Sequence, residues 1–326
     1  MRAGSSWLRH SALVLFAALA IGHAAHAEPP DQGIIKFIVG APAGGAIDPY
    51  ARLIADHMGK TLKQTIVVEN KAGANGTISA QWVVDQPADG HVVWVGTQAM
   101  TEINPSAYSH LRWTINDFVP LIKGVESPVV LVVHPSVPAK NLAEVVAWVK
   151  ANPGKLSYAS WSPGTPSAFL GYQLNEKFGL DMTHVPYRGS APQTTDLLAG
   201  HALIGFAQMQ SSLPHIRAGR LRAIAITSAA RSKNLPDVPT FAELGYPEFT
   251  ATVWFGLLVK SGTPEPAIAR LVAAAKAAHA DPVVREKLEK QGFDVPALTG
   301  PEFEAGIKTQ IARWARIIKA TGFKAD

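Results

Sequence analysis

The sequence predicts an α/β protein that is built from two lobes. Strand-like and helix-like segments alternate from about residue 34 to the C-terminus. The roughly 300 residues after the N-terminal segment contain no long linker, and chains of this length tend to form two lobes. Two junctions, about half a chain apart, share one pattern: a hydrophobic strand enters a short loop of Gly, Pro and small residues that opens into a helix.

The first half of the chain begins with one of these junctions. Residues 34–39 form the apolar strand, 40–46 the loop, and the helix runs to about Leu62. Tyr50, Leu53, Ile54, His57 and Met58 recur at helical spacing in it. Further expected elements are a strand at 66–68, a glycine-rich turn at 70–76, a helix at 78–84 and a strand at 92–96.

The second half repeats the alternation. The continuous apolar run 129–133 predicts a strand buried on both faces. The second junction has its strand at 182–187, its loop at 188–192 and a helix through Leu197 and Leu198. Other expected elements are helices at 142–151 and 167–178, and strands at 157–159, 221–227 and 254–259. The strands at 129–133 and 254–259 would cross between lobes, which places residues 28–130 plus 250–326 in lobe 1 and 131–249 in lobe 2.

The last sixty residues or so are predicted to be helical, and two cap signals mark where helices begin. Thr263 is expected to cap a helix with Pro264 at its first position, and Thr299 to Glu302 have the spacing of a capping box. The apolar stripe from Phe303 to Ile318 favours core packing over a partner surface.

Both junctions predict an anion site. The first N–H groups of a helix have no partner within the helix, and the helix dipole favours negative charge in front of them. Two such loops in different lobes would hold one anion from both sides of a cleft, a common place for small-molecule sites.

Residues 1–27 are expected to be a cleaved signal peptide that directs the protein to the periplasm. Arg2 and Arg9 precede a short apolar run, and residues 25–27 form a small-x-small cleavage site. A membrane anchor is the alternative, but an apolar run of about 11–13 residues is short for a bilayer. The sequence contains no Cys, which excludes disulfides and thiolate metal sites.

The charge excludes some partners. The formal net charge of +5 falls to +3 without the signal segment, since that segment has two Arg and no acid. A balance so weakly positive, without a basic cluster, argues against nucleic acid and is compatible with a small anion. None of the eleven His lies in a His-Glu-x-x-His pattern, and no Walker or dinucleotide fingerprint occurs, so neither a metal nor a cofactor is expected.

Several motifs together resemble those of one family. Residues 44–52 (GGAIDPYAR) and 184–192 (HVPYRGSAP) are similar to the two ligand loops of the Bug family, the TctC-like receptors of tripartite tricarboxylate transporters. Residues 68–76, 235–240 and 254–257 continue the resemblance over nearly the whole chain after residue 27. It implies a two-lobed periplasmic-binding-protein (Venus-flytrap, type II) fold that closes on a small carboxylate. It further implies no catalytic chemistry, a monomer, and transient contact with integral-membrane transporter subunits.

The resemblance also implies which residues bind the ligand, chiefly through backbone amides. The first loop contributes Ala43, Gly44, Gly45, Ala46 and Asp48. The second contributes Tyr187, Arg188, Gly189, Ser190 and Ala191, and a third loop adds the hydroxyls of Ser160 and Thr165.

Three departures from the family pattern concern the ligand. Ala41 stands where an aromatic residue is usual, Ile47 where Ser or Thr is usual, and Ala207 where an Asp is frequent. Smaller or more apolar side chains would enlarge and dry the pocket. We therefore expect a carboxylate with a bulky or aromatic remainder rather than citrate or an amino acid.

Other readings remain open at this point. Gly44 and Gly45 could form a simple tight turn, and Asp48 could cap its helix. Arg188 could be a solvated charge, and Tyr187 could offer its hydroxyl to the ligand. A periplasmic sensor that presents its ligand to a membrane signalling protein is the main alternative function. A hydrolase is disfavoured because no Gly-x-Ser-x-Gly occurs, and Ser160, Ser162 and Ser190 have no obvious His and acid in a matching order.

Overall fold

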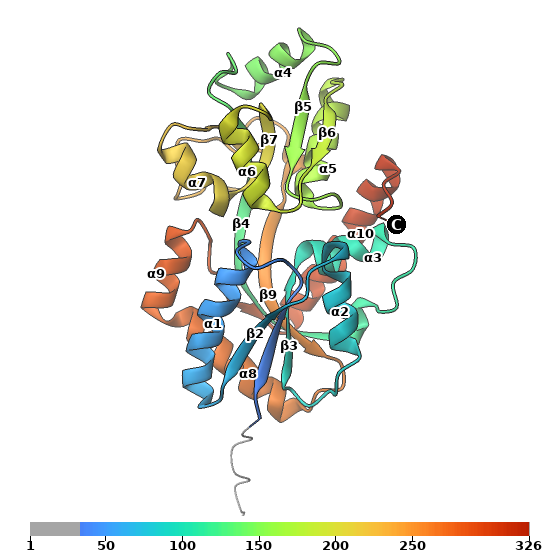
Figure 1. Cartoon of the computed structure of the whole chain (residues 1–326), viewed down its shortest axis with the longest axis vertical. Coiled ribbons are helices and arrows are strands. Elements are labelled where there is room, and N and C mark those ends of the chain that lie inside the picture. Colours follow the sequence, from blue (N-terminus) through green and yellow to red (C-terminus); the bar gives the residue numbers. More distant parts are fainter. Residues whose placement is uncertain (1–32, 326) are drawn as a thin grey trace, which may run out of the picture. The chain divides into compact units, whose positions relative to one another are not determined.

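The computed structural model describes residues 33–325, and the predicted signal segment 1–27 lies outside them. Strands and helices alternate as expected (Figure 1). The strands are β1 Ile35–Val39, β2 Ile66–Asn70, β3 Val92–Thr97, β4 Phe118–Val133, β5 Ser157–Ser160, β6 Thr183–Pro186, β7 Ile204–Gln208, β8 Arg222–Ile226, β9 Thr252–Lys260 and β10 Leu298–Thr299. The helices are α1 Ile47–Leu62, α2 Thr77–Val84, α3 Asn104–Ala107, α4 Leu142–Lys150, α5 Pro166–Phe178, α6 Ser190–Ala199, α7 Met209–Arg217, α8 Glu265–Ala280, α9 Pro282–Lys290 and α10 Pro301–Thr321.

The strands pair in the order β2-β1-β3-β9-β4-β7-β5-β6, and β8 and β10 also pair with β4. β4 is the longest strand and serves both halves of the sheet. Its residues 118–128 pair with β9, whereas residues 129–133 pair with β7, and 130–133 with β8. The sequence indicated only the second part, because Pro120, Gly124 and Pro128 interrupt the apolar pattern of the first.

The strand directions bring two sets of loops face to face. β1, β2 and β3 are mutually parallel, and they run in the same direction as β4 because β3 and β4 are both antiparallel to β9. β7 is antiparallel to β4, and β5 and β6 are parallel to β7. The carboxyl ends of β1–β3 and of β5–β7 therefore point toward each other along β4 (Figure 1).

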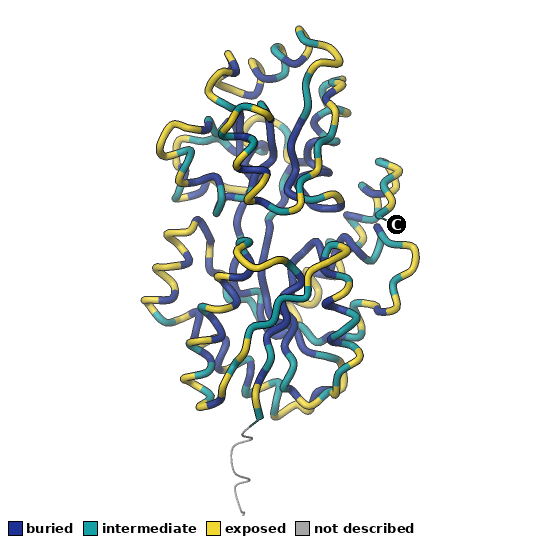
Figure 2. The backbone as a smooth tube through the Cα atoms, viewed as in Figure 1, coloured by how far each residue is buried: buried dark blue, intermediate teal, exposed yellow. Residues whose placement is uncertain are grey.

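The core follows the sheet. Residues 129–133 are fully buried, as the continuous apolar run predicted, and β9 is buried from Val253 to Val259. Figure 2 shows this buried backbone where the two strands pass between the halves of the sheet. Next to Gly124 of β4, the Tyr50 hydroxyl lies 3.1 Å from His279 Nε2, and this contact links α1 to α8. The stripe on α10 is core as expected: Phe303, Ile307, Trp314 and Ile318 are buried.

Two helix caps differ from the prediction. Thr263 does not cap α8; its hydroxyl donates to the carbonyl of Lys260, and Pro264 is the capping residue. Thr299 belongs to β10, and α10 begins after Gly300 without a side-chain cap. Within residues 33–325, no helix combines the length and apolar character that a membrane crossing requires.

Candidate ligand-binding site

The first predicted loop connects the carboxyl end of β1 to α1. α1 begins at Ile47 after Ala46, and no side chain caps it. Gly44 has φ +83°, a conformation that glycine adopts without strain. Within the described chain, the backbone N–H groups of Ala43 and Ala46 donate to no other group. This loop therefore presents unpaired N–H groups beside the positive end of a helix dipole.

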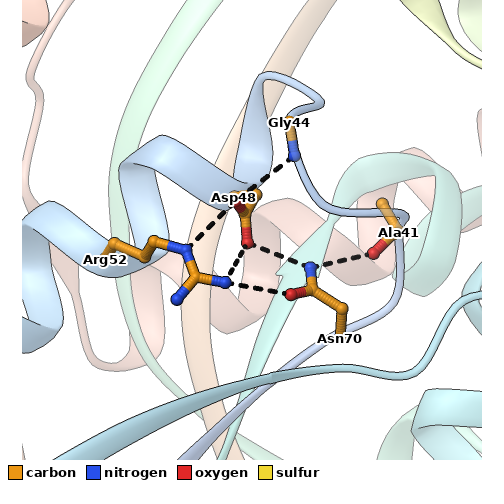
Figure 3. A network of polar contacts seen from close by, with 5 residues as sticks. All are labelled: Ala41, Gly44, Asp48, Arg52 and Asn70. Carbon is orange, nitrogen blue, oxygen red and sulfur yellow. Dashed lines mark hydrogen bonds and ion pairs between the residues drawn. The ribbon is translucent and has the colours of Figure 1, made fainter.

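Asp48 holds this loop together (Figure 3). Its carboxylate accepts hydrogen bonds from Arg52 Nε at 3.1 Å and Arg52 Nη2 at 3.0 Å. It also accepts from the Asn70 side chain at 3.0 Å and the Gly44 N–H at 3.3 Å. Asn70 in turn donates to the carbonyl of Ala41 at 3.0 Å. Asp48 is thus a loop-shaping residue with both oxygens in use, and not the N-cap of α1.

The ionisation of Asp48 follows from these contacts. The residue is only 6% exposed, and burial on its own would raise its pKa. Hydrogen bonds from Arg52, Asn70 and the Gly44 N–H outweigh burial and hold the pKa below its usual range. Asp48 is therefore an anion at neutral pH, neutralised by Arg52, so it does not oppose an anionic ligand at the neighbouring N–H groups.

The second predicted loop connects β6 to α6, and part of its backbone is already paired. The Tyr187 N–H donates to the carbonyl of Ser160 at 2.8 Å, and the Gly189 N–H to the carbonyl of Trp161 at 2.7 Å. The prediction that the Tyr187 and Gly189 amides contact ligand is therefore not supported by this arrangement. Gly189 has φ +121° and precedes α6 without a side-chain cap, so the first-turn N–H groups of Ser190 and Ala191 remain for a ligand.

The side chains of this loop also have partners or face solvent. The Tyr187 hydroxyl donates to Asp196 on α6 at 2.7 Å, which fixes it away from the role of ligand donor that the sequence suggested. Arg188 is exposed and forms no ion pair within residues 33–325. Its charge is free to attract anions toward the loop.

The third loop contains a contact that the sequence did not reveal. Ser160 Oγ lies 2.7 Å from His184 Nε2, although 24 residues separate them. They meet because β5 and β6 are neighbours, with Tyr158 stacked on the His184 ring at 4.9 Å. Burial lowers the pKa of His184, so the ring is neutral at pH 7. The Thr165 hydroxyl donates to the carbonyl of Ser162 at 2.7 Å and shapes the turn before α5.

One side chain joins the two sets of loops. Asn75, after β2, donates to the carbonyl of Gly164, after β5, at 3.1 Å. Asn75 also exchanges two hydrogen bonds of 3.0 Å with Asn104. The loops of the two sheet halves are therefore in direct contact, as the strand directions require.

The residues that departed from the family pattern are enclosed. Ala207 is fully buried on β7 in a cluster with Val130 and Leu197, and Ile47 is 5% exposed in the main core. Ala41 is half-buried and packs against the same core. The prediction that small or apolar side chains at these positions enlarge and dry the pocket gains no support from Ala207 or Ile47, because both are buried in core clusters.

Comparison with known proteins gives consistent matches. The model of the tripartite tricarboxylate transporter family receptor matches residues 50–323. Protein BugT of Bordetella pertussis (strain Tohama I) is 34% identical over 293 residues, covering 89% of this chain and 90% of BugT. The structure of periplasmic binding protein BugD has a TM-score of 0.82 at 32% identity and covers 91% of this chain and 99% of its own. MatC (Rpa3494) from Rhodopseudomonas palustris, with bound malate, has a TM-score of 0.79 at 32% identity and covers 87% and 99%.

Proposed function

Because the chain belongs to the receptor family of tripartite tricarboxylate transporters, we propose that it captures a small carboxylate between its two lobes and delivers it to transporter subunits in the membrane. The family and the two-lobed periplasmic-binding-protein fold agree with the expectations from the sequence. Members of this family are receptors rather than enzymes, which agrees with the expected lack of catalytic chemistry.

One observation carries the proposed ligand class: two loops with unpaired N–H groups stand at facing carboxyl ends of parallel strands. Ala43 and Ala46 precede α1, and Ser190 and Ala191 begin α6. An anion between them would bridge two helix N-termini that otherwise face water. We infer a carboxylate as this anion, since the similar protein MatC has malate bound. A bulky or aromatic remainder stays a prediction for this chain.

The lobes would meet where β4 changes partners. Residues up to Pro128 pair with β9, and the Val129 carbonyl accepts from the Thr227 N–H in the other half. This change supports the proposed boundaries near residues 130 and 250. α10 qualifies the assignment of residues 250–326 to lobe 1, because the Tyr172 hydroxyl on α5 donates to the Ala320 carbonyl at 3.2 Å. Hinge motion about β4 and β9 would close the lobes on the ligand.

Export and partners follow from the receptor role. The family is periplasmic, and a cleaved signal at residues 1–27 would deliver this chain there. In the closed state the two lobes form one composite surface, which the membrane subunits would recognise. The receptor would act as a monomer. A membrane signalling protein could read the same surface, so sensing remains the alternative role.

A ligand screen tests the proposal. Mass spectrometry of the purified protein under native conditions identifies any retained carboxylate, and a thermal-shift panel of aliphatic and aromatic acids ranks the candidates. The variant Gly45→Val is the control: a Cβ at Gly45 meets only the Pro42 carbonyl at 3.6 Å, so the loop accepts it while its approach to a ligand is blocked. Stabilisation of wild type but not of Gly45→Val supports the proposal. Equal stabilisation of both would place the ligand elsewhere.

A further inference from the structure

A cavity of about 320 Å³, lined by no residue of the predicted ligand loops, lies between α10 and the strands β4 and β9. Its polar wall contains Glu102, Lys123 and Arg313, and its apolar wall contains Trp254, Phe303 and Ile307. Glu102 belongs to a π-helical turn, Ala99–Ile103. Such turns are rare in proteins, and those that occur are often at functional sites. The receptor role does not use any of these residues.

Arg313 brings a positive charge to this wall, where the acidic group that acts on it electrostatically is Glu102. It is half-buried, and within residues 33–325 it forms no ion pair. Its guanidinium makes only long hydrogen bonds, 3.4 Å to Gln310 Oε1 and 3.3 Å to the Glu248 carbonyl, and lies 5.5 Å from the Trp314 ring. Partly buried charges are normally paired, so a guanidinium on a cavity wall favours an anion there.

The two other charged groups do not oppose an anion. Lys123 is positive, and it pairs with the carboxylate of Glu126, which also accepts from the Thr252 hydroxyl at 3.1 Å. The negative charge of Glu126 is therefore neutralised and does not repel an anion in the cavity. Glu102 is 3% exposed and accepts from Trp254 Nε1 at 2.8 Å. Burial raises the pKa of Glu102 to about 8, so its carboxyl is mostly protonated at pH 7 and leaves the Arg313 charge largely without a counter-ion.

We propose that this cavity is a second binding site, for a small organic anion whose charged group pairs with Arg313 while its apolar part packs on Trp254, Phe303 and Ile307. The cavity wall also includes Thr250–Thr252, the segment that enters β9. An anion at this place would contact the strand that joins the two halves, so its binding would act on the hinge rather than on the ligand loops.

Benzoate is a suitable probe, and the indole N–H signals of Trp254 and Trp314 in ¹⁵N NMR report on the cavity directly. Their assignment comes from single Trp→Phe variants. We expect saturable benzoate shifts of both signals in wild type, and a loss of affinity of at least about tenfold in Arg313→Gln. Arg316→Gln is the matched control, because Arg316 is exposed on the same helix and does not line the cavity.

Two further variants separate this site from the ligand loops. Gly306→Ile adds bulk at the cavity wall, where a Cβ has nothing within 4 Å, and should also abolish the shifts without removing a charge. Gly45→Val should keep them, so failure of the receptor proposal would leave this result unchanged. The proposal is overturned if wild type shows no saturable shift, if Arg313→Gln and Gly306→Ile bind benzoate like wild type, or if Gly45→Val loses the shifts.

Discussion

The side chain of Asn75 donates a hydrogen bond to the backbone carbonyl of Gly164 at 3.1 Å, across 89 residues of sequence. Asn75 follows β2 in one half of the sheet and Gly164 follows β5 in the other. Asn75 has φ +50°, a conformation that Asn tolerates better than most residues. Asn104, fully buried, holds the Asn75 amide in place. This contact links the two sets of loops that form the candidate site.

Replacing Asn75 should loosen the contact between the halves. Asn75→Gly keeps the positive φ but removes the side-chain hydrogen bonds to Gly164 and to Asn104, each of which contributes about 1 kcal/mol. We expect a larger radius of gyration by small-angle X-ray scattering and ligand affinity about fivefold weaker. Asn152→Ala, which removes only a local bond to Trp148, is the control. Unchanged scattering in Asn75→Gly would show that this bond does not hold the halves together.

Asp48 should contribute to stability as well as to loop shape. Asp48→Asn removes the charge that Arg52 and the Gly44 N–H bind, so we expect a loss of about 2 kcal/mol in urea denaturation at pH 7. Asp56→Asn, at an exposed pair with Lys60, should cost under about 0.5 kcal/mol. Because the pKa of Asp48 is lowered on folding, its contribution is present above the usual value of 3.8 and is lost as the pH falls below it. A stability difference that did not shrink in acid would contradict this assignment.

Glu102 should destabilise the fold as the pH rises. Its pKa is raised from 4.5 to about 8, so between these values the unfolded chain ionises while the folded chain keeps the proton. Stability is therefore lost from about pH 4.5 upward and levels off near pH 8, by at most about 5 kcal/mol. Glu102→Gln should remove this slope in denaturation measured from pH 5 to 8. A parallel pH dependence in both proteins would mean that Glu102 is ionised in the folded state.

Gly124 should accept no side chain. A Cβ there would lie 2.2 Å from both the Tyr50 hydroxyl and His279 Nε2, the buried pair that links α1 to α8. Gly124→Ala should cost about 1–3 kcal/mol by overpacking and leave ligand binding unchanged. Gly306→Ala, on α10 with open space around its Cβ, should instead stabilise by up to about 1 kcal/mol. Thermal denaturation of the two variants tests whether the first lowers and the second raises the stability of the fold.

The sequence predicted most elements because they depend on local patterns. The run 129–133 was long and apolar enough to mark a buried strand, and α1 was visible from its periodic apolar residues. The first part of β4 was not predicted as a strand, because its prolines and Gly124 are typical of loops. Pairing with β9 makes these residues part of the strand. Thr263 and Thr299 had the chemistry of caps, but the Thr263 hydroxyl bonds locally to the Lys260 carbonyl, and Thr299 pairs with Ile122 of β4.

The loops of the candidate site could be located from the sequence, but the hydrogen bonds that their residues form could not be predicted. Gly, Pro and small residues before a helix have a local signature, so both loops could be located. Whether an amide is still unpaired depends on distant neighbours: the Gly189 N–H is taken by Trp161, and the Tyr187 hydroxyl by Asp196. The Ser160–His184 contact likewise required the pairing of β5 with β6, which only a known register could have provided.

A crystal structure of the receptor with its carboxylate bound tests the main proposal most directly. We predict that the oxygens of one carboxylate lie about 3 Å from N–H groups in residues 43–46 and, at once, from the N–H of Ser190 or Ala191. A guest that touched the loop of a single sheet half, or that sat away from both helix starts, would contradict it.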